Sequence, residues 1–303
     1  MTVRVGAVDL GTNSTRLLVA DVEDGMVDVL ARGLRITRLG ESVDTRRKLL
    51  PTAIARVRNV LVEYRRELEA LGVDRTLAVA TSAVRDADNG EAFLGEVEWS
   101  YGFATRLLSG DEEAALTYRG VAAGREIQSG TLIVDIGGGS TELILPDRHA
   151  SLDVGCVRLT ERLGEDADAA GGYVANLLPE WPVESAIGVA GTVTSLAALD
   201  LGLQTYDPER VHGHVMSAAA VDEQLRRLAS LTLEERRALP GLEPDRAPVI
   251  VAGAAILRAV LRSYGLDSIE ASEHDLLHGV ALAAAELPER DADAAPPGAY
   301  TCC

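Results

Sequence analysis

The chain has 303 residues, of which 47% are hydrophobic and 25% charged, enough for two domains with separate hydrophobic cores. Its formal net charge of −18 argues against a general nucleic-acid binder, because such a protein needs a basic face to replace counterions. No uncharged apolar run is long enough to span a bilayer, no signal peptide is recognisable, and the three cysteines show neither disulfide nor metal spacing. We therefore expect a cytoplasmic protein without nucleic-acid or membrane partners.

Apolar runs typical of strands alternate with amphipathic runs typical of helices, which predicts an α/β protein. The expected strands are 3–9, 15–21, 27–35, 76–81, 104–108, 131–136, 141–145, 186–190 and 248–251. The expected helices are 52–71, 90–101, 111–119, 193–201, 219–230, 254–264 and 273–286. Pro51 and Gly72 flank the first of these helices and are typical start and stop residues. The tail from 288 to 303 is rich in Asp, Ala and Pro, and we expect it to be disordered.

One thirteen-residue pattern occurs twice. Residues 7–19 read AVDLGTNSTRLLV and residues 133–145 read IVDIGGGSTELIL, with six identical positions. The shared frame of Asp, Gly, Ser, Thr and Leu within matching strands favours a duplicated hairpin over two unrelated turns. The repeat divides the chain into an N-terminal lobe over 1–122 and a C-terminal lobe over 123–287.

Each copy is a strand that ends in an aspartate, followed by a glycine-containing turn and a second strand. Glycines let backbone N–H groups approach phosphate oxygens, and hydroxyl and amide side chains add donors. The candidate phosphate-binding residues of the two turns are Gly11, Thr12, Asn13, Ser14, Gly137, Gly138, Gly139, Ser140 and Thr141. Carboxylates beside phosphate repel it unless a cation intervenes, so Asp9 and Asp135 indicate Mg²⁺ or Mn²⁺. Glu142 is either a further metal-facing carboxylate or a solvent-facing strand residue.

Two other segments carry candidate anion-binding groups. Arg85 follows a strand and opens a helix, where its guanidinium can bind phosphate or pair with Asp86 or Asp88 at the surface. Gly191 and Thr192 begin a helix after a strand, and the N–H groups of a helix N-terminus attract anions.

The duplicated hairpin resembles the phosphate loops of the actin-like ATPase superfamily. The chain as a whole is similar to the exopolyphosphatase and guanosine pentaphosphate phosphatase family, most specifically in LSGDEEA (108–114) and DIGGGSTE (135–142). Other matching stretches are ATSAVRDADN (80–89), GCVRLTER (155–162), VAGTVTSLAAL (189–199), YDPERVHGHV (206–215) and VIVAGAAILRAVL (249–261). The resemblance implies two actin-like (ribonuclease H-like) lobes, each with a mixed sheet flanked by helices, and an active site in the interdomain cleft.

The resemblance also implies a catalytic role for Glu113, as the group that activates the attacking water. The same stretch is a helix start in which Ser109 and Glu112 form a capping box, so Glu113 is otherwise an ordinary first-turn acid. The implied reaction is Mg²⁺-assisted release of orthophosphate from the end of inorganic polyphosphate. The nearby alternative is removal of the 5′-phosphate of guanosine pentaphosphate.

Two other classes stay open. An ATP-dependent phosphotransferase of the same superfamily needs an adenosine pocket, and the single glycines at Gly191 and Gly253 argue against one. A non-catalytic polyphosphate or alarmone sensor does not need the carboxylates that the chain carries. Weaker candidates for contact with a long substrate are Arg119, Arg158 and Arg162. A homodimer is compatible with all of these interpretations.

Overall fold

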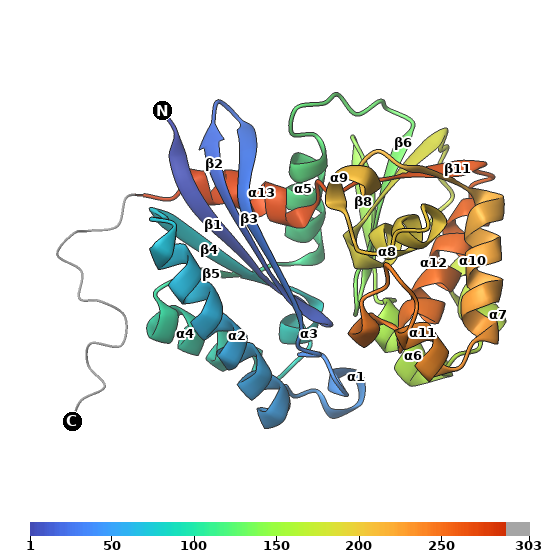
Figure 1. Ribbon diagram of the computed structural model, residues 1–303, viewed down its shortest axis with the longest axis horizontal. Coiled ribbons are helices and arrows are strands. Elements are labelled where there is room, and N and C mark those ends of the chain that lie inside the picture. The colour runs from blue at the N-terminus through green and yellow to red at the C-terminus, as the bar shows by residue number, and fades with distance from the viewer. Residues whose placement is uncertain (289–303) are drawn as a thin grey trace. The chain divides into compact units, whose positions relative to one another are not determined.

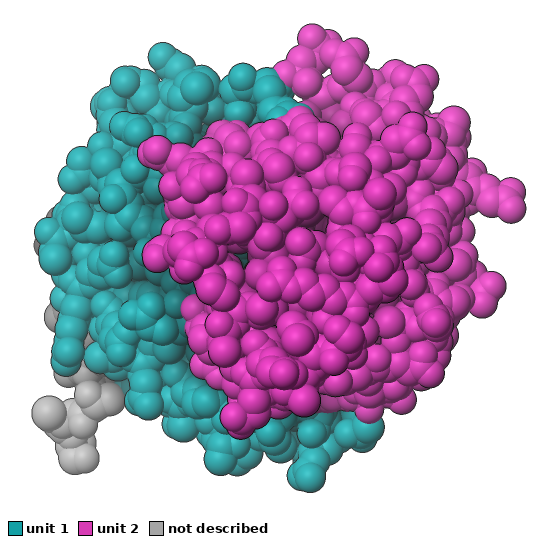
Figure 2. Space-filling model, turned by 45° about the vertical axis from the view of Figure 1, so that its right-hand side comes forward, with its two compact units in different colours: residues 1–125, 276–303 teal, residues 126–275 magenta. Residues whose placement is uncertain are grey.

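The computed structural model describes residues 1–288 and consists of two compact units. Of the described residues, unit 1 contains 1–125 and 276–288, and unit 2 contains 126–275 (Figure 2). The tail that we expected to be disordered lies outside the described residues, except for Pro288. Within residues 1–288, no helix combines the length and the apolar character that a membrane crossing requires.

Unit 1 is built on a five-stranded sheet with the order β3-β2-β1-β4-β5 (Figure 1). Its strands are β1 (Val3–Leu10), β2 (Ser14–Glu23), β3 (Met26–Ile36), β4 (Arg75–Ala80) and β5 (Ala104–Leu107). Its helices are α1 (Val43–Arg46), α2 (Pro51–Ala70), α3 (Ser82–Arg85), α4 (Gly90–Tyr101), α5 (Gly110–Val121) and α13 (Leu276–Ala285). Only β2 runs opposite to its neighbours, so β1, β3, β4 and β5 all end at the same edge of the sheet. The residues that follow these four strands are therefore gathered along that edge.

Helices cover both faces of this sheet. Successive side chains along a strand point to opposite faces, so a strand of consecutive apolar residues needs cover on both sides. Leu17 of β2 belongs to the core under α2 and α4, where it is joined by Tyr64 of α2. The next residue, Leu18, belongs to the core on the other face, together with Leu116 of α5 and Val280 of α13. The strands β1 and β2 are therefore buried on both faces, which explains their almost continuous apolar sequence.

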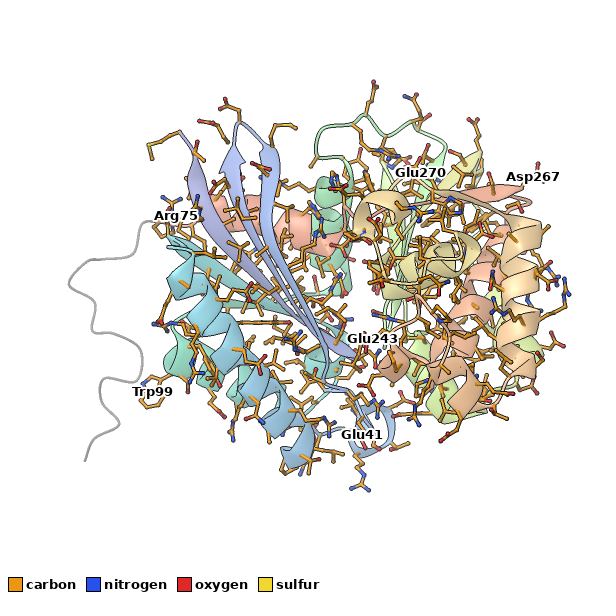
Figure 3. The ribbon with its side chains drawn as sticks, viewed as in Figure 1. Glu41, Arg75, Trp99, Glu243, Asp267 and Glu270 are labelled. Atoms are coloured by element: carbon orange, nitrogen blue, oxygen red, sulfur yellow. The ribbon has the colours of Figure 1, made fainter. Side chains whose placement is uncertain are left out.

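The last helix packs in unit 1, whereas the sequence placed it in the C-terminal lobe. A Cβ atom on Gly279 of α13 would lie only 1.9 Å from the backbone oxygen of Leu116, so the two helices touch backbone to backbone. Arg75 at the start of β4, labelled in Figure 3, donates to the backbone oxygen of Ala285 at the end of α13. The sequence of α13 shows that it is buried but not which sheet it covers.

We expect Gly279→Ala to lower the free energy of unfolding by about 3 kcal/mol, because a new methyl group must push two helix backbones apart. Gly95→Ala is the matched control: Gly95 lies in α4 with open space around its Cβ position. That change should raise stability by about 0.5–1 kcal/mol through helix propensity alone. Thermal and urea unfolding of the full chain measure both, and a Gly279→Ala protein as stable as the wild type would contradict the close packing of α5 and α13.

Unit 2 is built on a six-stranded sheet with the order β10-β11-β9-β6-β7-β8. Its strands are β6 (Thr131–Ile136), β7 (Thr141–Leu145), β8 (Arg148–Leu152), β9 (Ser185–Val189), β10 (Val215–Ser217) and β11 (Ser268–Ala271). Its helices are α6 (Cys156–Leu163), α7 (Ala167–Ala175), α8 (Ala190–Asp200), α9 (Pro208–Val211), α10 (Ala218–Ser230), α11 (Leu233–Arg237), the short 3-10 helix η1 (Pro244–Arg246) and α12 (Ile250–Ser263). β6, β9 and β11 are parallel and end at one edge.

The expected strand over 248–251 is wrong, because α12 already begins at Ile250. The N–H of Gly253 donates to the backbone oxygen of Val249 at 3.1 Å, which is the spacing of an α-helix. A short apolar run of valine and isoleucine fits a buried helix as well as a strand, and the alanines that follow extend the helix. The strands β8, β10 and β11 are short and include polar residues, so the hydrophobic pattern did not indicate them.

The two units share one strand order. In unit 1 an antiparallel run β3-β2-β1 continues into parallel β4 and β5, and in unit 2 the run β8-β7-β6 continues into parallel β9 and β11. The repeated sequence occupies equivalent hairpins, β1–β2 and β6–β7. The expected fold class, two similar α/β lobes with mixed sheets flanked by helices, is confirmed.

Candidate active site

The first hairpin turn holds Gly11, Thr12, Asn13 and Ser14 between β1 and β2. The N–H of Gly11 donates to the backbone oxygen of Ser14 at 3.0 Å, which closes the turn. The backbone oxygens of Thr12 and Asn13 accept hydrogen bonds from the segment that follows β3. In a trans peptide the N–H points opposite to the preceding carbonyl, so the N–H groups of Asn13 and Ser14 point away from that segment. Two backbone donors are thereby presented on the other side of the turn.

Asn13 adds a side-chain donor to this turn. The residue is only 6% exposed, and its Nδ2 atom has no hydrogen-bond acceptor within residues 1–288. A buried amide N–H without an acceptor costs about 1–3 kcal/mol, which an oxygen-rich ligand at the turn would offset. This observation fits an anion-binding role for the first hairpin.

The second hairpin turn, in unit 2, has the same closure. The N–H of Gly137 donates to the backbone oxygen of Ser140 at 3.0 Å. The carbonyl oxygens of Gly137, Gly138 and Gly139 accept from Cys156 and Val157 N–H groups at the start of α6 and from the Arg158 side chain. By the same peptide geometry, the N–H groups of residues 138–140 point away from α6. The glycine-rich sequence therefore presents three backbone donors on the side of the turn away from α6.

The two hairpins differ at the residue opposite the aspartate. In the first, Asp9 faces Arg16 across the strands, and the two side chains form an ion pair at 2.9 Å. In the second, Asp135 faces Glu142, which is 0% exposed and accepts a hydrogen bond from Ser151 on β8 at 2.8 Å. Glu142 is therefore not a solvent-facing strand residue. Two buried carboxylates opposite each other repel unless a proton or a cation neutralises them.

Thr141 uses its side chain within unit 2. It is 0% exposed, and its hydroxyl donates to the backbone oxygen of Val154 at 2.6 Å. The donors available at this turn are therefore the backbone N–H groups together with the hydroxyl of Ser140.

Glu113 lies in the first turn of α5, directly after the end of β5. The helix begins with a capping box, in which Ser109 and Glu112 bond to each other's backbone N–H groups. These hydrogen bonds hold the pKa of Glu112 below its usual value. Glu112 is exposed and serves the cap, whereas Glu113 is 6% exposed and faces the interior. Burial of a carboxylate needs a compensating charge or a function.

Arg85 supplies that charge. It ends α3, which follows β4, and its Nη1 atom lies 3.4 Å from Oε2 of Glu113 and 2.7 Å from the backbone oxygen of Leu108. Gly40 packs against both the first hairpin turn and α3, because a Cβ atom on it would lie 2.3 Å from the Thr12 side chain and 3.1 Å from that of Ala83. Unit 1 thus brings together the first hairpin, Arg85 and Glu113, with the guanidinium beside Glu113 and not in a surface pair.

The start of α8 in unit 2 is a tight and strained turn. Ala190 has a φ of 63°, a left-handed conformation that is unfavourable for a residue with a Cβ. A Cβ on the next residue, Gly191, would lie 2.2 Å from the guanidinium of Arg246, so a larger residue there would have to displace that side chain. Thr192 is buried against Gly253, whose Cβ position lies 2.7 Å from the threonine side chain, which agrees with a packing role for Gly253.

Residues 18–287 match the family model described as Ppx/GppA phosphatase family. The chain belongs to this family. It is accordingly a phosphoanhydride hydrolase.

Individual relatives and solved structures are similar to most of the chain. Exopolyphosphatase 2 of Mycobacterium tuberculosis is 38% identical over 93% of this chain and 98% of its own length. A crystal structure of the Aquifex aeolicus family member has a TM-score of 0.77 at 29% identity, covering 95% of this chain and all of that one. A crystal structure of an exopolyphosphatase from Cytophaga hutchinsonii has a TM-score of 0.83 at 25% identity, covering 91% and 96%.

Sequence reasoning missed two arginines at these turns. Arg16 occupies the position of Glu142 in the repeat, so an alignment of the two copies already places a charge opposite Asp9. Arg246 follows a stretch without any expected element, and no sequence signal indicates its contact with Gly191. Of the weaker candidates, Arg158 contacts the second hairpin, whereas Arg119 pairs with Glu286 and Arg162 lies near Tyr173.

Proposed function

We propose that this Ppx/GppA family member is an exopolyphosphatase that releases orthophosphate from the end of inorganic polyphosphate. The observation that carries the proposal is the buried Glu113 beside Arg85, at the sheet edge that also carries the first hairpin. The name of the Mycobacterium tuberculosis relative supports the choice of polyphosphate as the substrate.

In the proposed reaction, Glu113 accepts a hydrogen bond from a water molecule and orients it toward the terminal phosphorus. The water oxygen forms a new bond to phosphorus, and the bond to the bridging oxygen breaks, so the products are orthophosphate and a chain shorter by one unit. The water proton passes to Glu113. Because the transition state is loose, orientation and charge neutralisation contribute more than the basicity of the carboxylate.

Arg85 and the hairpin donors have the complementary role of binding charge. The guanidinium of Arg85 can exchange its long contact with Glu113 for a phosphate oxygen, since a separation of 3.4 Å is a weak ion pair. The backbone N–H groups of both turns and the amide of Asn13 provide donors that need no rearrangement when phosphate charge develops.

Asp135 and Glu142 are the residues that we propose to hold Mg²⁺ or Mn²⁺. Residues 1–288 contain no group of three or more acidic, histidine or cysteine side chains arranged to hold a metal ion. This fits Mg²⁺, which commonly takes one or two carboxylates and completes its shell with water and phosphate oxygens. When bound, such an ion neutralises phosphate charge and polarises the phosphoryl group. Asp9 already has a cationic partner in Arg16 and is the weaker candidate.

The test is a phosphate-release assay with Mg²⁺ on tripolyphosphate, long-chain polyphosphate and guanosine pentaphosphate. We expect turnover of polyphosphate to exceed that of guanosine pentaphosphate. The reverse preference would reassign the protein to 5′-phosphate removal, and ATP-dependent phosphorylation of an acceptor would reassign it to the kinases. Binding of polyphosphate without any turnover would support a sensor. A cytoplasmic location and a homodimer remain predictions from the sequence.

A further inference from the structure

A loop of fourteen residues, 37–50, links β3 to α2 and carries the short helix α1; we call it the α1 loop. It starts beside the first hairpin turn, because Ile36 at the end of β3 pairs with Ser14. The N–H groups of Thr37 and Arg38 donate to the backbone oxygen of Asn13 at 3.1 and 2.9 Å. Figure 1 shows α1 at the end of the sheet where β1 ends, and Figure 3 labels Glu41 on the same loop.

The α1 loop is also tied to the segment after Arg85. The N–H of Asp88 donates to the backbone oxygen of Arg47 at 2.7 Å. The side chain of Asn89 bonds to both the N–H and the oxygen of Leu49, at 2.8 and 3.1 Å. At its other end, the N–H of Gly40 donates to the backbone oxygen of Thr12 at 2.8 Å. The loop therefore connects the two groups that we propose to bind the terminal phosphates.

The shape of the loop is imposed by these contacts and not by local preference. Arg38, Ser42 and Arg47 have φ values of 49°, 60° and 54°, and they are three of the five non-glycine residues within 1–288 that have a left-handed backbone. Such conformations cost free energy and persist only where the surroundings hold them.

The α1 loop also carries the one run of three consecutive basic residues in the chain, Arg46, Arg47 and Lys48. Lys48 is the only lysine of a protein whose net charge is −18. All three side chains are exposed, and none has an ion-pair partner within residues 1–288. Four acidic residues lie on the loop or on the segment that it contacts. Glu41 pairs with Arg56 at 2.8 Å, Asp44 lies in α1, and Asp86 and Asp88 lie in the segment after Arg85.

We propose that Arg46, Arg47 and Lys48 form a subsite for the distal phosphates of a linear polyanion whose terminal phosphate is bound at the first hairpin. The inference rests on the proposed function. It names the residues through which the enzyme would bind a long polyphosphate more tightly than a short one. An otherwise acidic protein repels a polyphosphate, so a local basic run on the loop that joins the hairpin to the segment after Arg85 determines where the chain can extend. Exposed ionic contacts are individually weak, so their effect is expected mainly on chains long enough to reach all three.

The test compares wild-type protein with the triple variant Arg46→Gln/Arg47→Gln/Lys48→Gln on tripolyphosphate and on long-chain polyphosphate. We expect KM for the long chain to rise about tenfold, the combined effect of three exposed ionic contacts, with kcat unchanged. The KM for tripolyphosphate should change by less than about twofold, because a short chain makes few of these contacts. The salt dependence of the long-chain KM should also become shallower.

The matched control is Arg66→Gln/Arg226→Gln/Arg227→Gln, which removes three exposed positive charges on α2 and α10. It changes the net charge equally and should leave both KM values near those of the wild type. An equal effect of the control on long chains would overturn the subsite in favour of a general charge effect. An unchanged long-chain KM in the α1 loop variant, with an unchanged melting temperature, would overturn it directly.

Equilibrium binding separates this inference from the proposed function. Long-chain polyphosphate binding is measured in the Glu113→Gln background, with and without the α1 loop substitutions. If the wild type hydrolyses no polyphosphate but the α1 loop variant still binds it about tenfold more weakly, the proposed function fails and the subsite stands. If polyphosphate is hydrolysed but neither binding nor KM depends on the loop, the subsite fails and the proposed function stands.

Discussion

Replacing Glu113 with glutamine should lower kcat for phosphate release by about a thousandfold, within the range that loss of a general base produces. The change removes the charge that orients the water and keeps the volume of the side chain. Binding should be retained or strengthened, because Arg85 loses the carboxylate 3.4 Å away and keeps its positive charge for the substrate. Steady-state kinetics and equilibrium binding of polyphosphate measure the two effects separately.

Glu112→Gln is the control for this variant, since it changes the adjacent residue in the same way. Glu112 is exposed and completes the capping box with Ser109, which glutamine can also form, so the change should reduce stability by less than about 1 kcal/mol, through loss of a negative charge at the helix N-terminus, and kcat by no more than a few-fold. Equal losses of kcat in the two variants would mean that the start of α5 matters only as a structural element. A Glu113→Gln protein with wild-type kcat would remove Glu113 from the mechanism.

The duplicated hairpins could be predicted from sequence because their determinants are local. A strand, a glycine turn and a second strand are specified within thirteen residues, and both copies form the same turn, closed by the same hydrogen bond between Gly11 and Ser14 and between Gly137 and Ser140. The amphipathic helix α2 was equally clear, since its apolar spacing and its proline start are local signals.

Features that depend on tertiary packing could not be predicted. For example, α13 packs in unit 1 through a backbone contact between Gly279 and Leu116, and these two residues are more than 150 positions apart in the sequence. The position of Arg246 over Gly191 and the left-handed backbone of Ala190 arise from the same kind of long-range fit. The run at 248–251 was misassigned because hydrophobicity alone does not separate a buried helix from a strand.

If the proposed metal site is correct, the exchange of Arg16 for Glu142 between the two hairpins should have a measurable consequence. In the first copy an arginine neutralises Asp9, whereas in the second a buried glutamate lies opposite Asp135. Two buried carboxylates opposite each other repel, so a divalent cation bound between them should stabilise unit 2. At a metal concentration a hundred times the dissociation constant, the gain is about 2.7 kcal/mol.

Glu142→Gln should therefore raise the Mg²⁺ concentration for half-maximal activity by at least about tenfold. In the presence of EDTA the same variant should be more stable than the wild type, because one of the two opposed charges is gone. Glu180→Gln is the control, since Glu180 is exposed in unit 2 and its removal changes the net charge equally. Mg²⁺ titration of activity and thermal unfolding with and without EDTA measure both effects. The two effects of Glu142→Gln have opposite signs only if Glu142 faces a metal ion: Mg²⁺ activation becomes weaker, and the stability in EDTA rises. If Glu142 only packs in the core, its replacement should lower the stability in EDTA as well.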